Sequence, residues 1–276
     1  MYVTNVENST AFYTRVLGLP SGGGGCVGGP APCFPVNVVP DQLIELEQLP
    51  SPAPKDWLAE VAFATEDVAE MRRYLVAHDV TVGKISKDGK GAQHFELHDP
   101  EGNSIAFVQR PLTVVDYETS PNQVSTRLIH AGFVVKDLAA ENRFYIELLG
   151  FRRYWRGGFK DVDRSAVASE KDTDWYEIQV PDGPDWIEYM LNIPANADHK
   201  DLGVQNHFSL GVKDAQAAAA QLRKNGLQSF DGPEVGRDGK NSLDAYDPDG
   251  TRIEVMEFMP TQKPCCHPYT APHPKP

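Results

Sequence analysis

Apolar and polar positions along the chain follow one plan that returns four times. Each copy starts with a short run in which apolar residues alternate with small or polar ones, a pattern typical of a β-strand. The next residues carry apolar positions three and four apart, which predicts an amphipathic helix. Short β-like runs then follow. The strand-and-helix parts of the four copies are residues 1–18, 60–79, 130–150 and 207–226.

Capping residues mark the helices of the third and fourth copies. Asp137 and Asp214 stand where an N-cap is expected, and Gly150 and Gly226 stand where each helix should stop. Each copy closes on a short apolar run that predicts its last strand. These runs are 43–47, 104–108, 186–190 and 252–256.

Two longer echoes relate the two halves of the chain. The segment FYTRVLGL at 12–19 returns as FYIELLGF at 144–151, and DPEGNSIAF at 99–107 returns as DPDGTRIEV at 247–255. One copy alone is too small to enclose a core, so adjacent copies should pair. We therefore predict an α+β fold of four βαβββ modules, which form two paired, cupped mixed β-sheets with the helices outside.

The repeat also sets the expected domains. Residues 1–112 should hold modules one and two, and 128–260 modules three and four. The polar stretch 113–127 between them is the expected linker. The Pro-rich tail, 261–276, is expected to be disordered.

Charge narrows the class of partner. The 276 residues carry 39 acidic and 26 basic side chains, a net charge of −13. This disfavours nucleic acid and anionic membranes, both of which attract basic patches, and favours a small-molecule ligand. No apolar run approaches the roughly 20 residues of a membrane span. We expect a soluble cytoplasmic protein, although an export signal that had been removed would leave no trace in this sequence.

Candidate chemistry lies on the first and last strands of modules three and four. Side chains alternate across a strand, so His207 shares a face with small Ser209, opposite the bulky residues that must cover the helix side. The same count places His130 on the inner face of module three. Glu188 and Glu254 each sit mid-strand among apolar neighbours, where a carboxylate needs a cation or several donors.

The repeat makes these four residues equivalent in pairs. His130 and His207 match on first strands, and Glu188 and Glu254 match on last strands. If modules three and four pair with pseudo-twofold symmetry, all four side chains converge in the cup. Two imidazoles and two carboxylates suit one divalent metal ion, namely Zn, Ni, Co, Mn or Fe(II).

The chain resembles the vicinal oxygen chelate superfamily. The resemblance lies in the module starts, in the Leu-Gly helix ends at 17–18 and 149–150, and in the two DP[ED]G turns. That superfamily includes glyoxalase I, methylmalonyl-CoA epimerase, fosfomycin resistance proteins and extradiol dioxygenases. The resemblance covers nearly the whole chain and implies a glyoxalase-like fold. It places the metal ligands, in a His-Glu-His-Glu order like that of bacterial glyoxalase I, on His130, Glu188, His207 and Glu254.

The resemblance leaves three functions open. The first is a metal-dependent isomerase or lyase of the glyoxalase or epimerase kind, which moves a proton through a metal-bound enediolate with Glu254 and Glu188 as acid and base. The second is an Fe(II) extradiol dioxygenase with His130, His207 and Glu254 as its three ligands. Asp244 stands where such enzymes have Tyr, and Glu188 fills a position that they leave open. The third is a metal-free binding protein like the bleomycin resistance proteins.

The N-terminal half is expected to lack a complete site. Its corresponding positions are Glu45, Glu60 and Ala106, and the counterpart of His130 would precede Met1, so the true start of the chain stays open. We expect this half to support the fold or to join two copies in a homodimer.

Several other residues have ordinary explanations. His94 and His98 fall on a predicted strand, and the glycines of 22–25 predict a loop without phosphate-binding features. A disulfide between Cys26 and Cys33 is allowed but not required. Three aromatic residues could either line the pocket or pack in the core: Tyr154, Trp155 and Tyr189. In the tail, three residues could suggest a second metal site: Cys265, Cys266 and His267.

Overall fold

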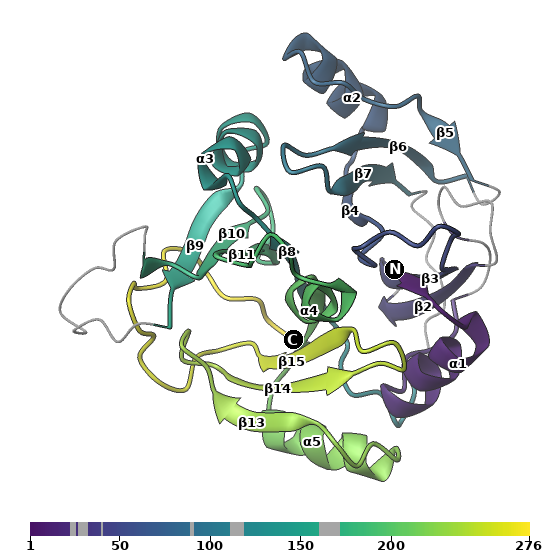
Figure 1. Cartoon of the computed structure of the whole chain (residues 1–276), viewed down its shortest axis with the longest axis vertical. Coiled ribbons are helices and arrows are strands. Elements are labelled where there is room, and N and C mark those ends of the chain that lie inside the picture. Colours follow the sequence, from purple (N-terminus) through teal and green to yellow (C-terminus); the bar gives the residue numbers. More distant parts are fainter. Residues whose placement is uncertain (23–25, 27–32, 40, 89–90, 111–118, 160–171) are drawn as a thin grey trace.

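The structure is a computed structural model of the whole chain (Figure 1). It describes residues 1–22, 26, 33–39, 41–88, 91–110, 119–159 and 172–276. Most of the expected glycine-rich loop, 22–25, and the first part of the expected linker, 113–127, lie outside these residues.

The N-terminal half folds as two modules with separate sheets. Module one forms a sheet in the order β1-β3-β2 and module two a sheet in the order β4-β7-β6-β5. In both, the first strand runs parallel to the last. The elements are β1 (Tyr2–Val3), α1 (Val6–Ala11), the π-helical segment η1 (Phe12–Val16), β2 (Cys33–Val39), β3 (Gln42–Gln48), β4 (Val61–Ala64), α2 (Val68–Ala77), β5 (Ser86–Lys87), β6 (Gln93–His98) and β7 (Ser104–Gln109).

The C-terminal half forms one continuous curved sheet of eight strands, in the order β13-β14-β15-β12-β8-β11-β10-β9. Its two modules join at the centre, where β8 and β12 pair antiparallel. The elements are β8 (Leu128–Val134), α3 (Leu138–Glu141), the π-helical segment η2 (Asn142–Leu148), β9 (Arg152–Gly157), β10 (Trp175–Gln179), β11 (Trp186–Met190), α4 (His199–Gln205), β12 (His207–Val212), α5 (Ala215–Lys224), β13 (Asp231–Val235), β14 (Asn241–Tyr246) and β15 (Arg252–Glu257).

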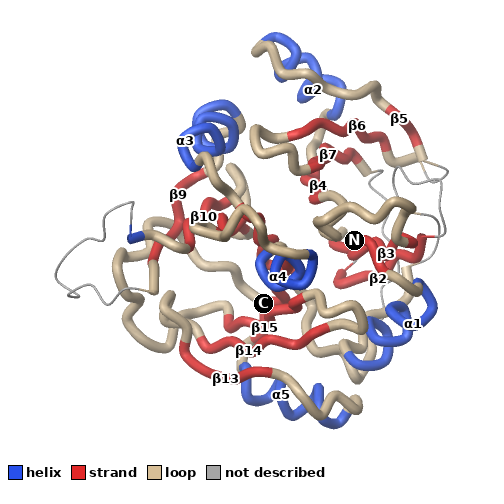
Figure 2. The backbone as a smooth tube through the Cα atoms, viewed as in Figure 1, coloured by secondary structure: helices blue, strands red, loops and turns tan. Residues whose placement is uncertain are grey.

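These sheets confirm the α+β glyoxalase-like class, with mixed sheets and with helices outside the curved one (Figures 1 and 2). One detail of the prediction is wrong. Modules one and two do not share a sheet within the described residues, because β1 has only two residues and pairs with β3 alone. The predicted pairing into a cup is therefore realised by modules three and four.

The predicted caps are present. The Asp137 side chain accepts a hydrogen bond from the Ala140 amide at 2.9 Å, and Asp214 accepts one from the Ala217 amide at 3.0 Å. Gly150 follows the first of these helices with a φ of +77°, a left-handed conformation that glycine adopts without steric cost. The module boundaries read from the sequence are thus set by local backbone chemistry.

Each of the two large hydrophobic cores contains residues from both halves of the chain. One core joins module one to module four, and the other joins module two to module three. Two buried hydrogen bonds follow the same pattern: Tyr13 Oη donates to Asp247 at 3.2 Å, and Tyr145 Oη donates to Asp99 at 3.2 Å. The FY segments of the sequence repeat therefore contact the DP[ED]G turns of the opposite half.

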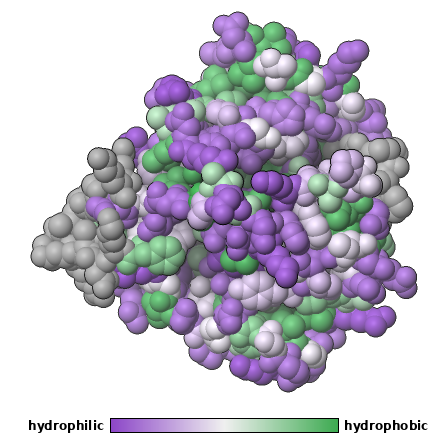
Figure 3. Space-filling model, in the orientation of Figure 1, coloured by the Kyte–Doolittle hydropathy of each residue, from purple (hydrophilic) through white to green (hydrophobic). Residues whose placement is uncertain are grey.

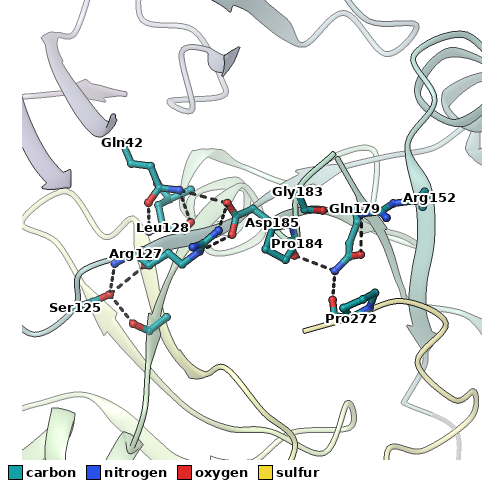
Figure 4. Close-up of polar contacts among 11 residues, drawn as sticks. Gln42, Ser125, Arg127, Leu128, Arg152, Gln179, Gly183, Pro184, Asp185 and Pro272 are labelled. Atoms are coloured by element: carbon teal, nitrogen blue, oxygen red, sulfur yellow. Dashed lines mark hydrogen bonds and ion pairs between the residues drawn. The ribbon is translucent and has the colours of Figure 1, made fainter. Parts of the chain in front are cut away.

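A polar junction adds to this contact between halves (Figure 4). Gln42, on β3, donates to the Leu128 carbonyl and accepts from the Leu128 amide, each at 2.8 Å. Beside it, the Arg127 guanidinium and the Asp185 carboxylate form two hydrogen bonds of 2.9 and 3.0 Å. The start of β8, which carries His130, is thereby fixed to the N-terminal half.

The tail prediction is wrong, because residues 261–276 pack against the C-terminal sheet. Tyr269 and Ala271 join a core cluster on the inner side of that sheet. The Thr270 amide donates to the Tyr154 carbonyl at 2.9 Å, and the Pro272 carbonyl accepts from Gln179 at 2.7 Å (Figure 4). A Pro-rich segment can pack in an ordered conformation against a sheet as well as remain in solvent. Its composition alone therefore gave the wrong prediction.

Disulfides join Cys26 to Cys33 and Cys265 to Cys266, so the cysteines are not free ligands. Within the described residues, no helix is long and apolar enough to cross a membrane. Hydrophilic residues cover most of the face in Figure 3, and hydrophobic ones form separate patches on it.

Candidate metal centre

The two predicted histidines come together at the centre of the curved sheet. His130, on β8, lies opposite Ser209 of the antiparallel strand β12, and His207 begins β12 opposite Gly132. A Cβ atom at Gly132 would overlap the His207 ring, so only glycine leaves room for the imidazole there. Both side chains are buried, and their Nε2 atoms are 3.1 Å apart.

The two predicted glutamates reach the same point from the adjacent parallel strands. Glu188 on β11 pairs in register with Gly132, and Glu254 on β15 with Ser209. One Glu254 oxygen lies 3.2 Å from His130 Nε2, and one Glu188 oxygen lies 3.5 Å from His207 Nε2. The four residues that the repeat made equivalent therefore converge in one buried cluster.

Three of the four residues satisfy a simple geometric condition for one shared ion. Ligand atoms of His130, Glu188 and His207 all lie within 4.8 Å of one another. Glu254 is outside that set of three, but its oxygen contacts the same His130 nitrogen, Nε2, that faces His207. The cluster offers two imidazole nitrogens and carboxylate oxygens, a donor set that suits divalent transition metals.

Protonation of the cluster is compatible with such an ion. Burial lowers the pKa of His130 well below its ordinary value, and Lys240 and Arg252 add to this effect. Burial and Arg252 likewise lower the pKa of His207, so both rings are neutral and can ligate. Burial, with Glu254 close by, raises the pKa of Glu188 to about 8. Two adjacent buried carboxylates are costly without a cation, and a divalent ion would remove that cost.

The imidazoles are oriented in different ways. His207 Nδ1 lies 2.8 Å from the Gln205 carbonyl, a contact that turns Nε2 toward the cluster. His130 Nδ1 has no hydrogen-bond partner among the described residues. Its ring instead packs against the Trp186 indole, with 4.8 Å between ring centroids.

Arg252 is a site residue that the sequence reading missed. Its Nη2 atom lies 2.9 Å from both ring nitrogens of His207, and its Nε donates to the Val204 carbonyl at 2.8 Å. Its Nη1 lies 3.6 Å from Asp244. Strand alternation could have found it, because Arg252 shares a face with Glu254, just as Trp186 shares one with Glu188.

Asp244 lies on β14, opposite Glu254 of β15. Burial and the Glu254 charge raise the pKa of Asp244 to about 6, while Arg252 opposes this shift. The site therefore holds a carboxyl where the extradiol pattern has a phenol.

The three aromatic residues that could line the pocket or pack in the core lie on different faces of the curved sheet. Tyr154 belongs to the core cluster inside the cup, with Trp186 and Tyr269. Tyr189 instead belongs to the core between the sheet and the helices. The Trp155 indole donates to the Cys265 carbonyl at 3.3 Å and so holds the tail.

The N-terminal positions do not assemble a comparable site among the described residues. Glu60 accepts from Ser104 at 3.3 Å, and Ala106 is buried on β7. Glu45 lies near Cys26 and Cys33, but that pair is a disulfide and cannot supply thiolates. The other histidines considered, His94 and His98, lie on β6 in this half.

A family model and one curated relative match parts of this chain. Residues 127–255 match the sequence model of the Glyoxalase/Bleomycin resistance protein/Dioxygenase superfamily. A probable lactoylglutathione lyase, chloroplastic, from Arabidopsis thaliana is 26% identical over 144 residues. That match covers 51% of this chain but only 38% of the plant protein, so the chain spans well under two thirds of that relative.

Solved structures share the fold over nearly the whole chain. The 2,3-dioxygenase LapB from Pseudomonas sp. KL28 superposes with a TM-score of 0.68 at 18% identity, covering 100% of this chain and 91% of that one. The Mn(II)-bound glyoxalase from Novosphingobium aromaticivorans gives a TM-score of 0.67 at 16% identity, covering 93% and 79%. An extradiol ring-cleaving dioxygenase from B. fuscum gives 0.64 at 20% identity, covering 92% and 69%. At these identities the likeness establishes the fold.

Proposed function

We propose that this chain, whose residues 127–255 place it in the Glyoxalase/Bleomycin resistance protein/Dioxygenase superfamily, is a divalent-metal-dependent isomerase or lyase. In this proposal it moves a proton between carbon atoms of a small oxygenated substrate. The observation that carries the proposal is the convergence of two neutral imidazoles and two glutamates at one buried point. The weak similarity to a probable lactoylglutathione lyase supports the same class.

The ion would be held by His130, Glu188 and His207, with Glu254 as the fourth ligand. When bound, it would act as a Lewis acid that polarises a substrate oxygen. The proton itself would be moved by Glu254 and Glu188, the acid and base of the proposed reaction.

The proposed acid–base role predicts the effect of Glu254→Gln. The amide keeps an oxygen donor but cannot take a proton, so proton transfer should fall about 100-fold or more while the metal still binds, more weakly. Exchange of the carbon-bound protons of methylglyoxal, with and without glutathione, can be followed by NMR in D2O with Mn(II) or Zn(II) bound. The control is Glu234→Gln, the same change at an exposed residue of β13. Unchanged exchange in Glu254→Gln would remove Glu254 from the mechanism.

Ring cleavage by Fe(II), with His130, His207 and Glu254 as the three ligands, is the second candidate, because Glu254 also lies 3.2 Å from His130 Nε2. Asp244 in place of a phenol and Glu188 among the donors favour proton transfer instead. Oxygen consumption with catechol after anaerobic loading of Fe(II) would establish the second candidate. A chain that binds small ligands fully but takes up no metal would instead be a binding protein of the bleomycin resistance kind.

A further inference from the structure

A lysine is buried deep in the same cup with its hydrogen bonds unmade. Lys240 directly precedes β14 and is 0% exposed. Within the described part of the chain, its Nζ atom has no hydrogen-bond partner. An ammonium group carries three N–H donors, and leaving them unpaired away from water is costly. A group that can accept those hydrogens is therefore expected at this position.

Aromatic rings hold the ammonium in place. It lies 4.1 Å from the centre of the Trp186 ring, 5.3 Å from that of Tyr154 and 5.2 Å from that of Tyr269. Such rings attract a cation through their π faces but do not accept its hydrogens as an oxygen does.

The neighbouring carboxylate does not replace the missing partner. The nearer oxygen of Asp238 is 3.8 Å from Lys240 Nζ, too far for a hydrogen bond. That oxygen accepts from the Tyr269 hydroxyl at 3.0 Å, and the other one accepts from the Lys240 backbone amide at 3.1 Å. Asp238 balances the charge of Lys240 without saturating its donors.

Two further buried polar groups beside Lys240 lack partners among the described residues. One is the Trp186 indole Nε1, and the other is the Glu177 carboxyl, both of whose oxygens are unpaired. On the paired strands β10 and β11, Glu177 lies opposite Glu188, so it shares the inner face and is diagonal to Trp186. Glu177 therefore lies on the same inner face as the other unpaired groups.

This group of unpaired polar atoms is next to the candidate metal centre. The indole of Trp186 contacts Lys240 and also packs against His130, with 4.8 Å between the Trp186 and His130 ring centroids. The same ring therefore adjoins both the buried ammonium and one predicted metal ligand.

We propose that Lys240 and Trp186 Nε1 form a subsite for a carboxylate of the substrate. This inference rests on the proposed function and names its substrate class. The substrate would be a short acid whose adjacent oxygens meet His130, Glu188 and His207 while a second carboxylate, a few bonds away, meets Lys240. Two oxygens and a negative charge match two unpaired donors, one of them cationic.

Two probes that differ only at the far end test this subsite. 2-Oxoglutarate and 2-oxopentanoate share the same adjacent oxygens, but only the former ends in a carboxylate. Calorimetric titration of the Mn(II)-loaded protein should give at least tenfold tighter binding of 2-oxoglutarate. In Lys240→Met, which keeps an unbranched side chain one atom shorter and removes the ammonium, this preference should disappear while Mn(II) affinity and 2-oxopentanoate binding persist. Lys240→Arg should retain part of the preference.

The control is Lys213→Met, which removes the same charge from an exposed position and should leave the preference intact. Equal binding of the two probes to the unaltered chain, or neither probe binding, would overturn the subsite even if Lys240→Met failed to fold. So would a full preference in Lys240→Met. The Mn(II) titration separates the two proposals: absence of metal binding contradicts the proposed function, whereas metal binding without probe preference contradicts the subsite alone.

Discussion

At the residue scale, the cluster shows which side chains a repeat can locate. His130 and His207 were placed by strand alternation and by their equivalence, and both geometric criteria depend only on backbone position. Arg252 and Lys240 were not located. Alternation from Glu254 does place Arg252 on the inner face, but the long side chain of Lys240 enters the cup from a hairpin, where no strand period indicates its direction.

The pKa of Glu188, raised to about 8 by burial and by Glu254, predicts a pH dependence of metal binding. A metal ion binds the carboxylate and must displace its proton below that pH. Affinity should therefore fall by up to about tenfold for each pH unit below 8. The histidines contribute little to this slope near neutrality, because their pKa values are lowered. Calorimetric titration with Zn(II) from pH 6 to pH 8 measures it.

The matched variant is Glu188→Gln, which should bind metal weakly and with a flat pH profile.

The thermal stability of the metal-free protein offers a second test of the raised pKa of Glu188. A carboxyl whose pKa is higher in the folded than in the unfolded chain stabilises the fold at low pH and loses that contribution as pH rises toward 8. The metal-free chain should thus melt at lower temperature at pH 8 than at pH 6, and bound metal should reverse this trend. An unaltered affinity across the range would contradict the assignment of Glu188 as a ligand.

At the element scale, each π-helical segment is tied to a turn in the other half. Removing the hydroxyl in Tyr145→Phe or Tyr13→Phe leaves a buried Asp99 or Asp247 oxygen without one donor. Each variant should lose about 1–2 kcal/mol in the free energy of unfolding. The two losses should add, because the contacts lie in separate cores. Urea denaturation monitored by circular dichroism measures both.

Tyr74→Phe is the control for this pair. Its hydroxyl also donates to a carbonyl, that of Leu148, but the side chain is 40% exposed and water can replace the contact. Its cost should stay below about 0.5 kcal/mol. Equal losses at Tyr74 and Tyr145 would show that burial is not what gives the crosswise contacts their strength.

The contacts between the two halves are the part of the fold that the sequence did not predict. The two echoes identified the modules and their caps, because N-cap and glycine signals are local. They did not indicate that an FY segment contacts the opposite DP[ED]G turn, nor that α4 forms between β11 and β12. Pairing between distant segments depends on how the halves dock, which a repeat alone leaves open.

At the scale of the whole molecule, the tail completes the C-terminal half. Residues 261–276 cross from the hairpin before β14 to β9, where Tyr269 packs on Tyr154 and His273 lies 2.5 Å from the Tyr154 hydroxyl. This order was missed because its Pro-rich composition is typical of disorder, while its partners are aromatic side chains of distant strands. The inner side of the cup is therefore formed by sheet and tail together.

Deleting residues 261–276 tests this assembly. Loss of the Tyr269 packing should uncover Trp186 and Tyr154, so tryptophan fluorescence should shift to longer wavelength. The lost aromatic burial, about 2–4 kcal/mol, should lower the melting temperature by roughly 5–15 °C. Deleting only 275–276, which are exposed, is the control and should change neither reading. If the long deletion leaves both fluorescence and melting temperature unaltered, the tail does not pack in the cup. The contact of the Tyr269 ring with Lys240 would then be lost from the proposed subsite as well.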